Sequence, residues 1–289
     1  MDGRDLGLFG PDSVTWRLHS HPSMMVGGLR ALLVQALNPL AMAGVDRYSR
    51  FREDLWGRLD RTTEFVMVTT FGDTASAGKA AARVRSIHGR VRGIDDITGL
   101  PYRADDPDLL LWVHAVEVDS FLAAYRHYGG RLTPDEADRY VAEMVRAAEL
   151  VGLDAQSVPA SAAELDAYLA GVTGLLLTPA ARQGMEVMLS PPLPLAARPL
   201  WKLIAAATVA TMPPDIRALY GLEWFKPASF GLRFNVAALC RAINLILPGP
   251  PQVRQARARA RALEAPSVVA ERRRRTPDLG HHRRVVEVT

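Results

Sequence analysis

His88 stands among arginines in the run from Arg83 to Arg92, and its setting could support chemistry. If this run is helical, Arg85, His88 and Arg92 fall at positions i, i+3 and i+7 and share one face. A lone histidine among like charges is poorly placed as a surface residue, but it suits a ligand to a metal carried by an anionic cofactor. Haem fits this description, because a histidine can bind the iron and arginines can pair with the propionates.

Two further groups could take part in chemistry. Arg58 and Thr62 are four residues apart, so a helix would place them on one face, where they could offer a guanidinium and a hydroxyl to an anion or oxygen species. Equally, they could be a surface arginine and an ordinary helical threonine. His114 lies in the apolar stretch 109–117 and is expected to be buried, so it needs a partner. It is either a core histidine bonded to a carbonyl or carboxylate, or a residue that meets the cofactor.

Several common chemistries lack their motifs in this chain. The sequence contains no HExxH or ExxH pair, no G-x-S-x-G nucleophile motif and no glycine-rich phosphate loop. The single cysteine, Cys240, excludes an intrachain disulfide and a CxxC zinc site, and it argues against a cysteine-ligated iron–sulfur cluster. Zinc, nucleotide and classical hydrolase chemistry are therefore disfavoured.

The elements that must position these residues are expected to be helices. Alanine- and leucine-rich stretches favour helix, and no strand-like alternation extends beyond a few residues, so the predicted fold class is all-α. Helices are expected at 23–45 with an interruption near Asn38-Pro39, and at 53–71, 75–91, 107–128, 134–151, from 161 onward, 198–211, 213–223, 231–246 and 251–265. Residues 1–22, 94–107 and 178–200 are expected to be irregular connections.

Composition and charge narrow the possible classes of protein. The chain has 289 residues, of which 48% are hydrophobic and 23% charged, enough for one large core or two modest ones. Much of the formal net charge of +4 comes from arginines after about residue 250. We therefore expect a helical domain over 1–250, followed over 251–289 by a basic amphipathic helix and a disordered tail.

The basic tail could contact an anionic membrane surface, whereas specific nucleic-acid binding is not expected. The N-terminus is acidic and polar, unlike a signal peptide, and the longest apolar runs are too short to span a bilayer. The sequence therefore predicts a cytoplasmic protein.

Taken in order, these motifs resemble one known family. They are Trp16, Gly27-Gly28-x-Arg30-Ala31-Leu32-Leu33-x-Gln35-Ala36-x-x-Pro39, Phe51, Gly57-Arg58-Leu59-x-Arg61-Thr62, Phe71-Gly72, Arg83-Val84-Arg85-x-Ile87-His88, Tyr102-x-Ala104-x-Asp106-Pro107 and Trp112-Val113-His114-Ala115. This order is similar to that of the MpaB/rubber-oxygenase catalytic-domain family, which includes the latex-clearing proteins. The resemblance covers roughly residues 8–230.

The resemblance implies a single all-helical domain, like the globin-like core of latex-clearing proteins, that binds one haem b. The R-x-x-H-x-x-x-R pattern of that branch falls on Arg85, His88 and Arg92, with His88 as the proximal iron ligand. Its R-x-x-x-T pair falls on Arg58 and Thr62, which it implies lie near the distal side and take part in catalysis. That branch uses O₂ to cleave polyisoprene.

The chain departs from the latex-clearing branch at one place. Those enzymes carry a catalytic glutamate upstream of the R-x-x-x-T pair, but residues 37–45 contain no acid, and Asp46 and Glu53 are the nearest. The expected function is therefore a haem-dependent oxygenase that acts with O₂ on an apolar small molecule other than rubber. The alternative is a non-enzymatic protein of the same fold that binds haem or an apolar ligand, or serves as a scaffold.

Overall fold

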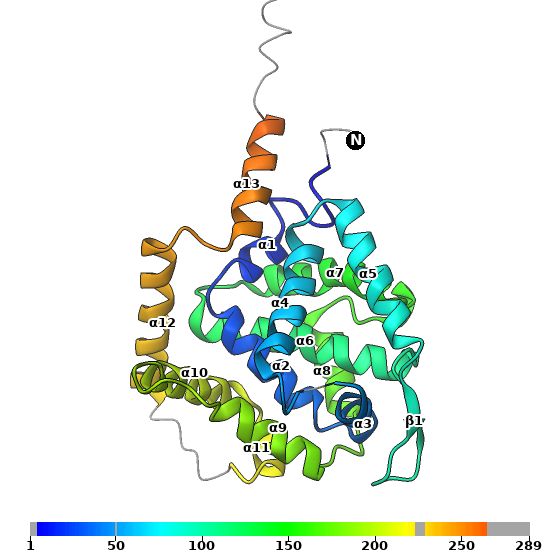
Figure 1. Ribbon diagram of the computed structural model, residues 1–289. Coiled ribbons are helices and arrows are strands. Elements are labelled where there is room, and N and C mark those ends of the chain that lie inside the picture. Colours follow the sequence, from blue (N-terminus) through cyan, green and yellow to red (C-terminus); the bar gives the residue numbers. More distant parts are fainter. Residues whose placement is uncertain (1–4, 50, 223–228, 265–289) are drawn as a thin grey trace, which may run out of the picture.

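The computed structural model describes residues 5–49, 51–222 and 229–264, and this part of the chain is built almost entirely of α-helices (Figure 1). The prediction of an all-α fold is confirmed. The helices are α1 (Val14–His19), α2 (Met24–Gln35), α3 (Pro39–Tyr48), α4 (Leu55–Phe71), α5 (Thr74–His88), α6 (Pro107–Tyr128), α7 (Pro134–Val151), α8 (Ala162–Gly171), α9 (Pro179–Leu189), α10 (Arg198–Thr211), α11 (Pro214–Leu219), α12 (Ser229–Ile246) and α13 (Pro251–Glu264).

The two helices at the centre are α2 and α6, which make the most extensive contact between any two helices of the described structure. Helix α6 begins as the sequence predicts, because the Asp106 side chain accepts from two backbone N–H groups and Pro107 occupies the first turn. Around this pair, α10 covers α2, while α7 and α8 cover α6. Arg30 of α2 is almost fully buried and binds Asp119 of α6 at 2.7 Å and the Thr211 carbonyl at 3.1 Å.

Gly27 permits the close approach of α2 to α6. A Cβ at Gly27 would lie 2.8 Å from Cδ1 of Phe121 and 3.1 Å from the carbonyl oxygen of Ser120, whereas one at the neighbouring Gly28 would meet nothing within 4 Å. The Gly27→Ala variant is therefore expected to lose about 1–3 kcal/mol of unfolding free energy through overpacking. Gly28→Ala should instead gain up to about 1 kcal/mol from helix propensity. Urea denaturation of both variants checks this, and equal gains would contradict the close approach.

The N-terminal segment is more ordered than expected. Residues 1–22 were predicted to be irregular, but α1 occupies Val14–His19. Ser13 caps this helix through the N–H of Trp16, and the carboxylate of Glu143, from α7, accepts from the first two backbone N–H groups of the helix. A helix of six residues is too short for hydrophobic periodicity to reveal. In addition, the hydrogen bonds of its first two N–H groups go to Glu143, a residue far along the chain.

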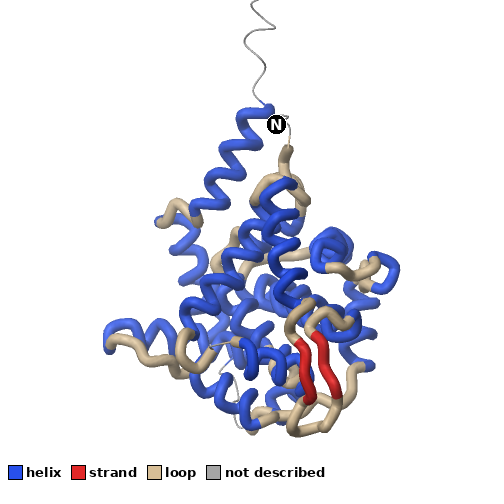
Figure 2. The backbone as a smooth tube through the Cα atoms, turned by 45° about the vertical axis from the view of Figure 1, so that its right-hand side comes forward, coloured by secondary structure: helices blue, strands red, loops and turns tan. Residues whose placement is uncertain are grey.

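Two other connections also differ from the prediction. The segment expected as a loop over 94–107 is part of a short antiparallel hairpin, whose strands are β1 (Arg92–Ile94) and β2 (Pro101–Arg103), and the hairpin lies at the edge of the helical body (Figure 2). Within 178–200, α9 forms behind a Thr178 cap with Pro179 in the first turn. The cap signal was present in the sequence, but the surrounding prolines obscured it.

The C-terminal helices α12 and α13 lie on the outside of the body, with α13 packed against α4. The expected tail beyond Glu264 lies outside the described residues. Within the described ranges, no single helix is long and apolar enough to cross a membrane, although the α2–α3 pair, bent by 104°, passes that test together on length and composition alone.

Candidate cofactor site

Helix α4 carries the first pair of predicted site residues. Asp54 caps the helix by accepting from the N–H of Gly57. Arg58 is half-buried and donates to the Ser49 hydroxyl at 3.0 Å, and its burial, helped by nearby Arg61, lowers its pKa. The exposed Thr62 donates its hydroxyl to the Arg58 carbonyl at 3.0 Å. The pair therefore shares one helical face, as its spacing predicts.

His88 is the last residue of α5, with Gly89 as the C-cap. The imidazole is half-buried, and its Nδ1 atom is buried without a hydrogen-bond partner in the described part of the chain. Burial lowers the pKa of His88, and the charge of Asp105 opposes that shift. The neutral form, which is the form that binds metals, is therefore favoured at this position.

The two arginines predicted beside His88 are placed differently from each other. Arg85 lies on α5, is exposed and donates through Nη1 to the Leu150 carbonyl near the end of α7. Arg92 does not lie on the helix: α5 ends at His88, and Arg92 belongs to β1, where its Nη2 donates to the Gly89 carbonyl at 3.1 Å. The predicted helical face that included Arg92 is therefore wrong, because the chain turns into the hairpin before reaching it.

His114 lies on α6 and is half-buried. Burial lowers its pKa to about 4, so the imidazole is neutral near pH 7. Among the described residues, no carbonyl or carboxylate bonds to it, contrary to the interpretation of a hydrogen-bonded core histidine.

Glu117 follows His114 by three residues on α6 and was missed as a candidate. Burial raises its pKa to about 7, and its charge helps to raise the pKa of Tyr140 on α7. It makes no hydrogen bond within the described ranges. The sequence carried one signal for this residue: Glu117 is the acid in a helical stretch, 109–117, whose other residues apart from His114 are apolar.

Near Glu117, a buried chain of hydrogen bonds joins three helices. His19 of α1 pairs through Nδ1 with the Thr70 hydroxyl of α4 at 2.9 Å, and through Nε2 with the Tyr140 hydroxyl of α7 at 3.0 Å. Burial lowers the pKa of His19 to about 3, so it stays neutral in the folded protein. Sequence reasoning placed His19 in an irregular segment and could not see these long-range partners.

These residues are chemically suited to haem. The buried Nδ1 atom of His88 lacks a hydrogen-bond partner among the described residues, so it would gain from a ligand. Among the described residues, no three His, Cys, Asp or Glu side chains gather closely enough to hold a metal ion by themselves. A metal bound through His88 would therefore need its other ligands from a cofactor such as a porphyrin.

Fold and site together define a helical domain with a histidine suited to a cofactor-held metal. Residues 16–245 match the family described as "ER-bound oxygenase mpaB/B'/Rubber oxygenase, catalytic domain", and the chain belongs to this family. No curated protein and no solved structure matches the chain. Membership supports an oxygenase-like function, with O₂ and a substrate as its general partners.

Proposed function

We propose that this protein is a haem b-dependent oxygenase that acts on an apolar small molecule with O₂. The observation that carries the proposal is the half-buried, neutral imidazole of His88, with its unpartnered Nδ1, in a chain of an oxygenase family. The second candidate is a non-enzymatic protein that binds haem or an apolar ligand, or acts as a scaffold. The lack of acids in residues 37–45, where the latex-clearing enzymes carry a catalytic glutamate, favours it.

The proposed roles are those that the family resemblance implies for these residues. Bound haem would supply a redox-active iron, held by the His88 imidazole. Arg85 and Arg92 would pair with the propionates, because each guanidinium has five N–H donors and gives only one to a backbone carbonyl. Arg58 and Thr62 would donate hydrogen bonds on the distal side, and His114 would contact the cofactor from α6.

Visible spectroscopy of the purified protein with added haem tests the proposal. A Soret band that saturates at one haem per chain is expected, followed by O₂ consumption when an apolar substrate is supplied. The absence of a Soret band at every haem concentration would overturn the proposal and favour the scaffold. Haem binding without O₂ consumption across a broad panel of apolar compounds would favour haem binding without catalysis.

The Thr62→Ala variant is expected to slow catalysis and to leave stability almost unchanged. The Thr62 side chain is exposed and bonds only to its own helix, so its loss is expected to change the unfolding free energy by less than about 0.5 kcal/mol. Loss of a distal donor should slow O₂ consumption about tenfold or more. The matched control is Thr63→Ala, which removes the neighbouring exposed hydroxyl. Equal rates in the two variants would remove Thr62 from the proposed distal site.

The proposal extends to location and surface contacts. We propose a cytoplasmic protein that touches anionic membranes peripherally through the basic region 251–289. The arginines of α13 support attraction to anionic lipid. Cell fractionation at low and high salt tests both parts: a salt-sensitive membrane fraction is expected, and recovery outside the cytoplasm would contradict the location.

A further inference from the structure

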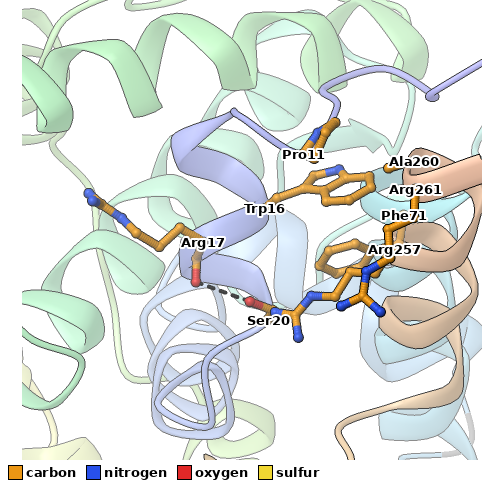
Figure 3. A pocket seen from close by; sticks show the side chains of 8 residues that line it. All are labelled: Pro11, Trp16, Arg17, Ser20, Phe71, Arg257, Ala260 and Arg261. Carbon is orange, nitrogen blue, oxygen red and sulfur yellow. Dashed lines mark hydrogen bonds between the residues drawn. The ribbon is translucent and has the colours of Figure 1, made fainter. Parts of the chain in front are cut away.

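A pocket of about 340 Å³ lies where α1, α4 and α13 meet, away from the residues assigned to the haem (Figure 3). Trp16 and Phe71 line it with their rings, whose centroids are 5.4 Å apart, and Arg257 and Arg261 line it from α13. Figure 3 shows both arginine side chains extending from α13 past the Phe71 ring toward Ser20. The volume is at the lower end of the range for small-molecule sites.

The wall that α13 forms is fixed by its packing. Val253 and Ala256 are buried against the cluster that contains Trp16, Met67 and Phe71. This docking faces Arg257 and Arg261, one turn apart, into the same pocket. The pocket, as lined by the described residues, therefore belongs to the folded body.

The last two carbonyl oxygens of α4 already have donors other than these two arginines. The indole N–H of Trp16 donates to the Thr70 carbonyl at 2.9 Å, and Arg259 donates to the Phe71 carbonyl at 2.8 Å. Arginines near the end of a helix often donate to its last carbonyl groups, but here Trp16 and Arg259 already do so. Arg257 and Arg261 are thus left for another acceptor.

Arg257 and Arg261 are both exposed, and neither forms an ion pair or hydrogen bond through its side chain with any described residue. Like charges one helical turn apart repel each other, so this arrangement costs stability until an anion lies between them. Arg17, which also lines the pocket, differs because it is paired with Glu136 at 2.7 Å. The positive charge facing the pocket therefore comes from the α13 pair.

We propose that this pocket binds a phosphate group, carried either by a phospholipid headgroup or by a soluble phosphate ester. Two guanidinium groups match the double charge and the multiple acceptor oxygens of a phosphate better than a single carboxylate does. The remaining volume, beside the edges of Trp16 and Phe71, accommodates the organic part of the ester. This site does not depend on haem or on oxygenase activity.

The test measures binding of inorganic phosphate and glycerol 3-phosphate by calorimetry, and binding of phosphatidic-acid-containing phosphatidylcholine vesicles by sedimentation. Arg257→Gln/Arg261→Gln is expected to weaken binding about tenfold or more, because it removes two charge-assisted contacts. The control, Arg126→Gln/Arg241→Gln, removes the same charge from exposed positions on α6 and α12 that do not line the pocket, and should change binding less than about twofold. Circular dichroism verifies the fold of both variants.

The arms of the experiment distinguish the two sources of phosphate. Pocket-dependent binding of vesicles alone identifies a lipid headgroup, and pocket-dependent binding of the soluble ester identifies a soluble ligand. Absence of binding to every probe overturns the proposal. Equal losses in the two double variants also overturn it, because they would show general attraction to a basic surface. All probes are applied to protein without added haem, so a failed oxygenase proposal leaves this result intact.

Discussion

Replacing His88 by alanine is expected to abolish haem retention. If His88 is the only protein ligand to the iron, its removal should weaken haem affinity by about a hundredfold or more, since even loss of an outer-shell partner costs roughly 10–100-fold in metal affinity. His88 lies at the end of α5 and is only half-buried, so the helix should survive the substitution. The measurement is the Soret absorbance after gel filtration of haem-loaded protein.

His127→Ala is the matched control for His88→Ala. His127 is also near the end of a long helix, but it is exposed and its Nδ1 atom bonds to the Ala123 carbonyl one turn earlier. This variant should keep full haem occupancy. Imidazole added to His88→Ala should partly restore the band, because it replaces the lost ligand without restoring any packing. Full occupancy in His88→Ala would end the assignment of His88 as the ligand.

Much of the fold could be predicted because its signals are local. Asn38 and Pro39 mark the break between α2 and α3, and the Asn38 side chain accepts from the next helix's first N–H groups. Thr133 and Glu136 form the capping box that starts α7. Such caps satisfy N–H groups that helix formation leaves unpaired, so they reveal a boundary wherever the rest of the chain lies.

The failures of sequence-based prediction arise where distant parts of the chain decide the local structure. Helix α1 is completed by Glu143, which lies over a hundred residues away. The run that contains His88 keeps helical spacing as far as Arg92, yet the helix ends at His88 because the following residues pair with 101–103 in the hairpin. Periodicity gives the face of a helix but not the residue at which tertiary pairing stops it.

In the candidate site, too, features set by local spacing could be predicted from the sequence, and features set by distant packing could not. Arg58 and Thr62 share a face because four residues on a helix always do, so their spacing was sufficient. Glu117 could not be recognised in the same way, because its raised pKa depends on burial by the helices around α6. A carboxyl group that keeps its proton up to about pH 7 can donate as well as accept a proton, which spacing alone does not show. It is therefore the acid whose role in the proposed oxygenase most needs to be measured.

Glu117→Gln is expected to stabilise the protein at alkaline pH and not at acidic pH. Folding raises the pKa of Glu117 from 4.5 to about 7 through burial. Below pH 4.5 the carboxyl group is protonated in both states and costs nothing. Between these values the unfolded chain releases the proton while the folded chain holds it, so stability falls as pH rises. Above about pH 7 the whole penalty is present, about 3 kcal/mol.

Glutamine keeps the shape of the side chain and removes its charge, so the variant should escape most of this penalty. At about pH 8 it should exceed the parent by about 2–3 kcal/mol in unfolding free energy, and the gain should vanish near pH 4. Urea denaturation across this pH range, on protein without added haem, measures the difference. Glu149→Gln, which removes an exposed carboxylate from α7, should show no such pH dependence. A gain that is the same at both pH values would show that burial does not hold the Glu117 proton, because a neutral packing effect does not depend on pH.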